Sequence, residues 1–203
     1  MSKVFLIENN LKSRRSIRRY LTDSVCNKIL FRLLESATWA PSAHNRQPWR
    51  FVVIKQNSKK EDLAYAMGDR LRADRSKDGD NMEIIEKDVT RSINLIVNSP
   101  VVIIVCYSMI DMDKYSDESR SYAEKIMAIQ STAMAVQNLM LAAHAEGLST
   151  CWRCAPLFCA DTVVNILDLP EDWNPQALIT MGYPNETPKV PTRLNLSEVT
   201  EWM

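Results

Sequence analysis

The chain has 203 residues, in which 25 lysine and arginine residues balance 25 aspartate and glutamate residues. This length suits one domain with a substantial core. A net charge near zero argues against a nucleic-acid or anionic-membrane surface, because both require a net basic face. The five cysteines, an odd number, fit a reducing cytoplasm better than a disulfide framework.

The first quarter of the chain predicts two helices and a strand. Residues 4–12 show a weak helical pattern, and their apolar stretch is too short for a signal peptide. In residues 25–39 apolar side chains recur at helical spacing, with Thr22 or Asp23 as candidate N-caps. The β-branched and aromatic run at 49–54 predicts a strand.

Residues 57–98 have a different character from the rest of the predicted single domain, residues 1–203. Residues 59–72 and 82–97 predict two charged amphipathic helices, and the polar stretch 74–80 between them lacks an apolar anchor. Two interpretations stay open. Residues 57–98 serve either as a mobile helical lid over a site or as a solvated connector between surface helices.

A strand and a long helix follow. The continuous apolar run at 100–106 predicts a strand buried on both faces. Residues 119–146 predict a helix ~40 Å long, whose polar residues argue against a membrane span. Its second half is apolar almost all round. That pattern favours a dimer interface, approached closely at Ala128, Ala135 and Ala142, over the central helix of a monomer.

The C-terminal part predicts short elements and an extended tail. Strands at 148–152 and 177–181 flank a helix at 161–167, for which Asp161 is the candidate cap. Several prolines follow residue 183 and prevent the tail from folding back as a helix. We therefore expect the tail to cross a neighbouring surface in extended form.

Two polar clusters carry the functional argument. The first, Arg14-Arg15-Ser16-Ile17-Arg18, has the composition of a phosphate site, because guanidinium groups pair with phosphate oxygens and serine adds a hydroxyl donor. The alternative is a set of solvated cations near a helix end.

The second cluster is the loop Pro41-Ser42-x-x-Asn45-x-Gln47-Pro48, which precedes a strand. Asparagine and glutamine amides each present a donor and an acceptor in one plane, which suits the edge of a flavin, a pterin or a base. The alternative is a turn-rich strand entrance whose polar groups satisfy the backbone.

The cysteines and histidines are weaker candidates. Cys151 and Cys154, with Cys159 nearby, admit a redox dithiol or half of a metal site, but buried small hydrophobic residues are the preferred interpretation. His44 and His144 are too few and too far apart in the sequence for a metal site. No metal is predicted.

Taken together, four motifs in order resemble the FMN-dependent nitroreductases. They are the two polar clusters, the stretch from Ala135 through Gly147 to Trp152, and Met181-Gly182-Tyr183-Pro184. The resemblance runs nearly end to end, apart from 57–98 and 108–118. It implies an α+β fold, a three-layer α-β-α sandwich with a mostly antiparallel central sheet flanked by helices. It also implies an intertwined homodimer with two FMN sites at the subunit interface.

The resemblance also assigns cofactor contacts. The first cluster would hold the FMN phosphate and ribityl chain, and the loop would lie against the ring, with Asn45 and Gln47 contributed by the partner chain. The backbone of 150–152 would pass the flavin N5, Gly182 would allow a close approach, and the tail Arg193, or more weakly Lys189, would return to the phosphate. The implied contacts are Arg14, Arg15, Ser16, Arg18, Pro41, Ser42, Asn45, Gln47, Thr150, Cys151, Trp152, Gly182 and Arg193.

The implied function is that of a cytoplasmic oxidoreductase without a fixed catalytic residue. Electrons would pass from NADH or NADPH through FMN to a nitro compound, quinone or enone in a ping-pong cycle. Arg153 and Cys154 replace the glycine that often follows Cys-Trp in the family, which would narrow or charge the pocket. The alternatives are a flavin-binding sensor or carrier without turnover, a specialised family reaction such as dehalogenation or dehydrogenation, and a dithiol redox protein.

Overall fold

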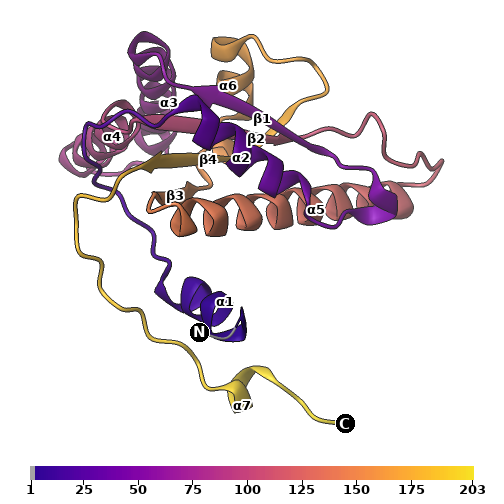
Figure 1. The fold of residues 1–203 in the computed structure, drawn as a ribbon. Coiled ribbons are helices and arrows are strands. Elements are labelled where there is room, and N and C mark those ends of the chain that lie inside the picture. Colours follow the sequence, from indigo (N-terminus) through magenta and orange to yellow (C-terminus); the bar gives the residue numbers. More distant parts are fainter. Residues whose placement is uncertain (1–2) are drawn as a thin grey trace.

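The computed structural model describes residues 3–203 and places a four-stranded sheet between two layers of helices (Figure 1). The order of the strands is β1-β2-β4-β3, and every neighbouring pair is antiparallel. The strands are β1 (Trp49–Ile54), β2 (Val101–Tyr107), β3 (Ser149–Arg153) and β4 (Asn174–Gly182). The predicted α+β sandwich is confirmed. Met1 and Ser2 of the predicted domain lie outside the described residues.

Strand β2 lies inside the sheet and supplies both apolar cores. All seven of its residues are buried, as the apolar run predicted. Val101, Ile103 and Val105 join one core cluster, whereas the residues between them join the other. This division follows from the alternation of side chains along a strand.

One face of the sheet is covered by α2 (Asn27–Thr38) and α5 (Glu118–Ala145). Helix α5 is long and apolar enough to cross a membrane. However, its buried side chains pack against the sheet and α2, which makes it a core helix. Gly147, with a φ of 77°, follows its end in the left-handed conformation, as predicted.

The interface predicted along α5 needs a correction. Ala128 and Ala135 are fully buried within their own chain, so they do not offer a surface to a partner. Ala142 packs against the same core cluster as Ala135. The exposed side of the helix carries Tyr122 and Met134 instead. Periodicity identifies the apolar positions, but it does not say which neighbour covers them.

The other face of the sheet is covered by α3 (Asn57–Lys77), α4 (Met82–Val97) and α6 (Ala160–Leu167). Leu63, Ile96 and Val163 are buried there, so α3 and α4 form part of a layer. The helix α3 continues through most of the stretch predicted as a polar hinge, and Arg75 near its end pairs with Asp80 and Asp88. Movement of 57–98 as a lid stays a prediction.

Two predicted caps are wrong. Cys26, not Thr22 or Asp23, occupies the N-cap of α2. Cys159 occupies that of α6, and Asp161 pairs with Arg70 of α3 instead. A cap is determined by where the chain turns into the helix, and composition alone does not locate that residue.

The two ends of the chain extend from the layered body (Figure 1). Helix α1 (Lys3–Ser13) touches α5, where Asn10 donates to the carbonyl of Leu141 at 3.1 Å. The tail after Pro184 is extended up to the short α7 (Leu196–Val199). Both ends expose apolar side chains, namely Val4, Phe5, Leu6, Ile7, Leu11, Val190, Leu194, Leu196, Val199, Trp202 and Met203.

The short elements η1 (Ala43–Asn45) and η2 (Ala155–Phe158) precede β1 and α6. Between α1 and α2, residues 14–21 run alongside the ends of β3 and β4. Ile17 donates its N–H to the carbonyl of Thr150 at 3.2 Å, and Leu21 donates to that of Tyr183 at 2.9 Å.

The side chain of Tyr20 attaches residues 14–21 to the sheet through hydrogen bonds. Its buried hydroxyl lies 2.5 Å from the carbonyl oxygen of Ile17 and 2.8 Å from Oγ1 of Thr180 in β4. Burial raises the pKa of Tyr20 above its usual range, so the phenol keeps the proton that these bonds use.

A Tyr20→Phe substitution tests this attachment. Removal of the hydroxyl leaves buried acceptors without their donor, and we expect the free energy of unfolding in urea to fall by about 1–3 kcal/mol. Tyr65→Phe on the exposed side of α3, where Tyr65 is 57% exposed, is the matched control and should change it by less than about 0.5 kcal/mol. Equal losses in the two variants would contradict the assigned role.

Candidate functional site

A basic pocket opens where residues 14–18 meet the C-terminal tail, with a volume of about 580 Å³. Its cations come from the two segments that the sequence singled out, and the hydroxyl-bearing Ser16 lies among them. The cations that line the pocket are Arg14, Arg15, Arg18, Lys189 and Arg193. The structure therefore brings the first polar cluster and the tail arginine together.

The positive charge of the basic pocket is poorly balanced. Glu186 is the one carboxylate among the described residues that line it, and its Oε1 accepts the backbone N–H groups of Arg18 at 2.6 Å and Arg19 at 3.3 Å. Burial and the nearness of Arg15 and Arg193 lower the pKa of the Arg14 guanidinium. Crowded cations of this kind favour a bound anion, because an anion offsets both their repulsion and their desolvation.

A larger polar cleft of about 1080 Å³ adjoins the basic pocket, and the two share Arg18 and Glu186. One wall is a stripe of α4, Lys87, Arg91 and Asn94, and Arg153 at the end of β3 lines the cleft as well. Arg153 thus adds charge to this cleft, and its narrowing or charging of a flavin pocket stays a prediction.

Sequence reasoning missed the α4 stripe. Lys87, Arg91, Asn94 and Asn98 recur at steps of four, three and four, which places them on one helix face. That spacing was a usable signal. The spacing alone did not say which part of the fold this helix face would meet.

The second polar cluster forms a tight loop on α5. His44, Asn45 and Gln47 all have a left-handed φ, at 48°, 55° and 50°, a conformation that costs roughly 1 kcal/mol for each such residue. Gln47 donates its N–H to Oγ of Ser42 at 3.1 Å. Ala43 donates to Oγ of Ser131 at 3.3 Å, which ties the loop to α5. The side chains of Asn45 and Gln47 are exposed.

The structure does not bring the two polar clusters together within one chain. The loop meets α5 at Ser131, in the middle of the helix, whereas Ser13, just before the basic pocket, contacts His144 near the C-terminal end of α5, at 2.7 Å. The 13 steps along the helix from Ser131 to His144 span ~20 Å. Figure 1 shows the loop that precedes β1 and the chain that follows α1 toward opposite ends of α5.

The side chains of the remaining predicted cofactor contacts are buried or bonded within their own chain. Thr150 and Cys151 are each 1% exposed, and the indole N–H of Trp152 donates to Sγ of Cys154 at 3.0 Å. A Cβ at Gly182 would lie 2.8 Å from Cδ of Pro100. Gly182 therefore permits the close approach of its own chain, and its contact with a cofactor stays a prediction.

The structure describes all five cysteines as free thiols, and three of them are buried. Burial raises the pKa of Cys151, so this thiol stays protonated at neutral pH and is a poor nucleophile. Burial also raises the pKa of Cys159 to about 11 and that of Cys106 to about 12. Cys151 and Cys159 are buried, as the preferred interpretation held, whereas Cys154 is exposed and that interpretation is wrong for it.

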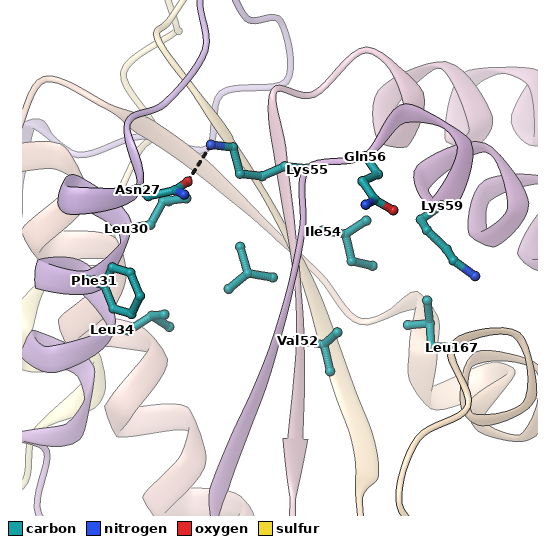
Figure 2. A pocket seen from close by; sticks show the side chains of 11 residues that line it. Asn27, Leu30, Phe31, Leu34, Val52, Ile54, Lys55, Gln56, Lys59 and Leu167 are labelled. Atoms are coloured by element: carbon teal, nitrogen blue, oxygen red, sulfur yellow. Dashed lines mark hydrogen bonds between the residues drawn. The ribbon is translucent and has the colours of Figure 1, made fainter.

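A third hollow, the edge groove, runs between α2 and the outer edge of β1 (Figure 2). It measures about 580 Å³, and Phe31, Leu34 and Val52 line it. Lys55 donates to Oδ1 of Asn27 at 2.7 Å across one end. No strand of the described chain pairs with this edge of β1, so its outward N–H and C=O groups are free to bind another strand.

Comparison with known proteins assigns the chain to a family. The model of the Nitroreductase family matches residues 11–183. A protein of Methanothermobacter thermautotrophicus, predicted to be an NADH dehydrogenase/NAD(P)H nitroreductase, is 31% identical over 196 residues, which cover 93% of this chain and 82% of the relative. The 5,6-dimethylbenzimidazole synthase of Rhodospirillum rubrum is 27% identical over 182 residues, which cover 88% and 82%.

Solved structures share the fold. A BluB-like flavoprotein from Clostridium difficile 630 superposes with a TM-score of 0.82 at 21% identity, covering 97% of this chain and 98% of that one. The FMN-dependent nitroreductase NfnB from Mycobacterium smegmatis, in complex with NADPH, gives a TM-score of 0.75 at 22% identity and covers 100% of both chains. Since the family model spans most of the sequence and a relative at 31% identity covers it almost throughout, this chain belongs to the nitroreductase family.

Proposed function

We propose that this protein is an FMN-dependent oxidoreductase that takes electrons from NADH or NADPH and passes them to a small organic acceptor. Nitro compounds, quinones and enones are the acceptor classes that we expect. The observation that carries the proposal is the basic pocket, which gathers five cations and Ser16 around a single carboxylate. Such a donor set fits a phosphate monoester.

The residues present fit FMN in two adjoining parts. Arg14, Arg18 and Arg193, with the Ser16 hydroxyl, would hold the phosphate, and the adjoining polar cleft offers room and flat polar groups for a ring. Arg91 and Asn94 would donate to the polar edge of that ring. The backbone of residues 150–152 stays our proposed neighbour of the flavin.

The chemistry would come from the cofactor, and the protein would bind and orient the reactants. FMN, when bound, supplies hydride acceptance and electron delivery. The donor and the acceptor would occupy the polar cleft in turn, which makes the kinetics ping-pong. Lys87 and Arg153 suit the pyrophosphate of a dinucleotide. No fixed acid or base is assigned, and we expect the enzyme in the cytoplasm with no nucleic-acid or membrane partner.

The proposal includes a homodimer, because one chain leaves its two polar clusters ~20 Å apart along α5. A second copy lying antiparallel along α5 would bring its loop, Pro41–Gln47, toward the flavin ring proposed beside the basic pocket of the first. The exposed apolar tail of each copy suits the edge groove of the other, where the free edge of β1 accepts an extended strand.

A specialised family reaction is the second candidate. It is favoured by the relative named 5,6-dimethylbenzimidazole synthase and by the close superposition of the BluB-like flavoprotein. In this case the bound flavin would be consumed and would not turn over. A sensor or carrier without turnover is the third candidate.

The phosphate assignment predicts a selective loss of FMN affinity. Arg193→Ala and Arg14→Ala remove charge-assisted hydrogen bonds worth about 1.5–3 kcal/mol each, so we expect FMN to bind roughly ten- to a hundredfold more weakly. Riboflavin, which lacks the phosphate, should bind both variants and the parent chain alike. Quenching of flavin fluorescence measures both affinities.

The control for these variants is Lys77→Ala, which removes an exposed cation at the end of α3. It should leave FMN affinity unchanged. Equal weakening of FMN and riboflavin would place the phosphate elsewhere, and a colourless protein that ignores added FMN would refute the whole proposal.

In the proposed dimer the edge groove is part of the interface between the two copies. Phe31→Asp places a charge in the groove, where Phe31 is 72% exposed in the single chain, and we expect it to weaken dimerisation at least tenfold in analytical ultracentrifugation. Ile84→Asp on α4, where Ile84 is 54% exposed, is the matched control and should leave the dimer intact. A parent chain that stays monomeric with FMN bound contradicts this arrangement.

Turnover separates the three candidate functions. We expect NADH or NADPH to bleach the bound flavin without oxygen, and menadione or nitrofurazone to restore the colour over many cycles. Stopped-flow absorbance follows both steps. Conversion of the flavin into 5,6-dimethylbenzimidazole in air, detected by mass spectrometry, would favour the specialised reaction. Bound FMN that neither nicotinamide bleaches would favour the sensor.

A further inference from the structure

A histidine and two carboxylates converge at the end of α5 that lies away from the basic pocket. His44 comes from η1, Asp113 from the loop between β2 and α5, and Glu124 from the first half of α5 itself. One nitrogen of the imidazole and one oxygen of each carboxylate lie within 4.8 Å of one another. Three separate segments thus direct metal-ligand atoms to one point.

Glu124 makes this cluster unusual. Its side chain is 2% exposed, and its Oε2 has no hydrogen-bond partner within the part of the chain that the structure describes. A buried carboxylate in this state is costly, so proteins pair such groups or use them to coordinate metal ions. The other buried side-chain atoms without a partner, on Thr132 and Thr150, are neutral hydroxyls.

Lys60 shows how the chain treats its other buried charge. It is 3% exposed, and its ammonium group donates to the carbonyls of Val97 at 3.2 Å and Ser99 at 2.7 Å. Glu124 has no comparable arrangement. The Glu124 carboxylate is therefore suited to pair with a cation.

We propose that His44, Asp113 and Glu124 form a binding site for a divalent transition-metal ion. An imidazole with two carboxylates suits Zn²⁺ and Mn²⁺, whereas a site without thiolate ligands disfavours soft ions such as Cu⁺. The three ligands leave further positions for water. Arg46 contacts Oδ1 of Asp113 at 2.5 Å and orients this carboxylate from the outer side, as groups around metal ligands commonly do.

The site has a structural consequence. His44 lies in the loop that Ser131 ties to α5, so a metal ion would fasten this loop to the helix at a second point. The ligands come from the loop, from the segment before α5 and from α5. We therefore expect the ion to stabilise the folded chain, since it binds only where these three segments meet.

Metal binding is tested on the full-length chain without an affinity tag, whether or not it is yellow. After treatment with EDTA, ZnCl₂ or MnCl₂ is added, and binding is followed by calorimetry and by thermal unfolding. We expect one ion per chain and a rise in Tm of roughly 5–10 °C at a hundredfold excess over Kd. MgCl₂ should act more weakly, because Mg²⁺ prefers oxygen ligands alone.

Two variants identify the ligands. Glu124→Gln and His44→Ala should each weaken binding by at least roughly tenfold. Glu124→Gln should also raise the Tm of the metal-free chain, because it removes the buried unpaired charge. His44 is exposed, so its replacement removes no buried packing, and the variant keeps the test valid if Glu124→Gln misfolds.

The controls are His144→Ala, the only other histidine in the sequence, and Glu118→Gln, an exposed carboxylate on the same helix. Neither should change metal affinity. The proposal is overturned if Zn²⁺ and Mn²⁺ neither bind stoichiometrically nor shift the Tm of the parent chain, or if His144→Ala removes binding as completely as His44→Ala. These readouts do not involve flavin, so they are independent of the proposed oxidoreductase activity.

Discussion

The length of α5 is the constraint on which the rest of this molecule depends. Its 28 residues form one continuous helix across a face of the sheet. The loop before β1 is fixed to its first half through Ser131, and the chain that leads into the basic pocket is fixed near its end through His144. A rigid helix cannot shorten to bring these two polar clusters together. The chain therefore keeps its two polar clusters apart, and in the proposed function a second copy brings them together.

Charge placement distinguishes the basic pocket from the rest of the surface. The arginines of α3 are each matched by carboxylates, as Arg72 is by Asp69 and Glu86. Arg14 and Arg193 form no ion pair within residues 3–203, although the whole chain holds as many acidic as basic residues. The chain therefore has enough carboxylates to neutralise this pocket and places them elsewhere. Such a distribution is expected of a pocket whose counter-charge arrives with a ligand.

Local signals predicted most of the fold and part of the site. The run at 49–54 was predicted with the bounds of β1, because β-branched and aromatic residues between turn signals specify a strand locally. The orientation of Ala128 and Ala135 was not predictable in this way, since a helix that is apolar all round has no unique inward face. The burial of Glu124 was likewise not predictable from the helix pattern alone. Its burial depends on the loop of His44 and the segment of Asp113, which are distant in sequence, and the printed sequence carries no sign of their meeting.

Helix α5 lies beside two clusters of unbalanced charge, one positive and one negative. Near its end the chain crowds cations together, and in its first half it buries a carboxylate without a partner. Either arrangement lowers the stability of the ligand-free chain, because like charges repel and a buried charge loses its hydration. Neither arrangement is needed to build the sheet or its two cores, which are apolar and closed around β2. Both clusters thus lower stability at positions that the fold does not require, which is best explained by ligand binding. A ligand of opposite charge that binds only the folded chain recovers the lost free energy.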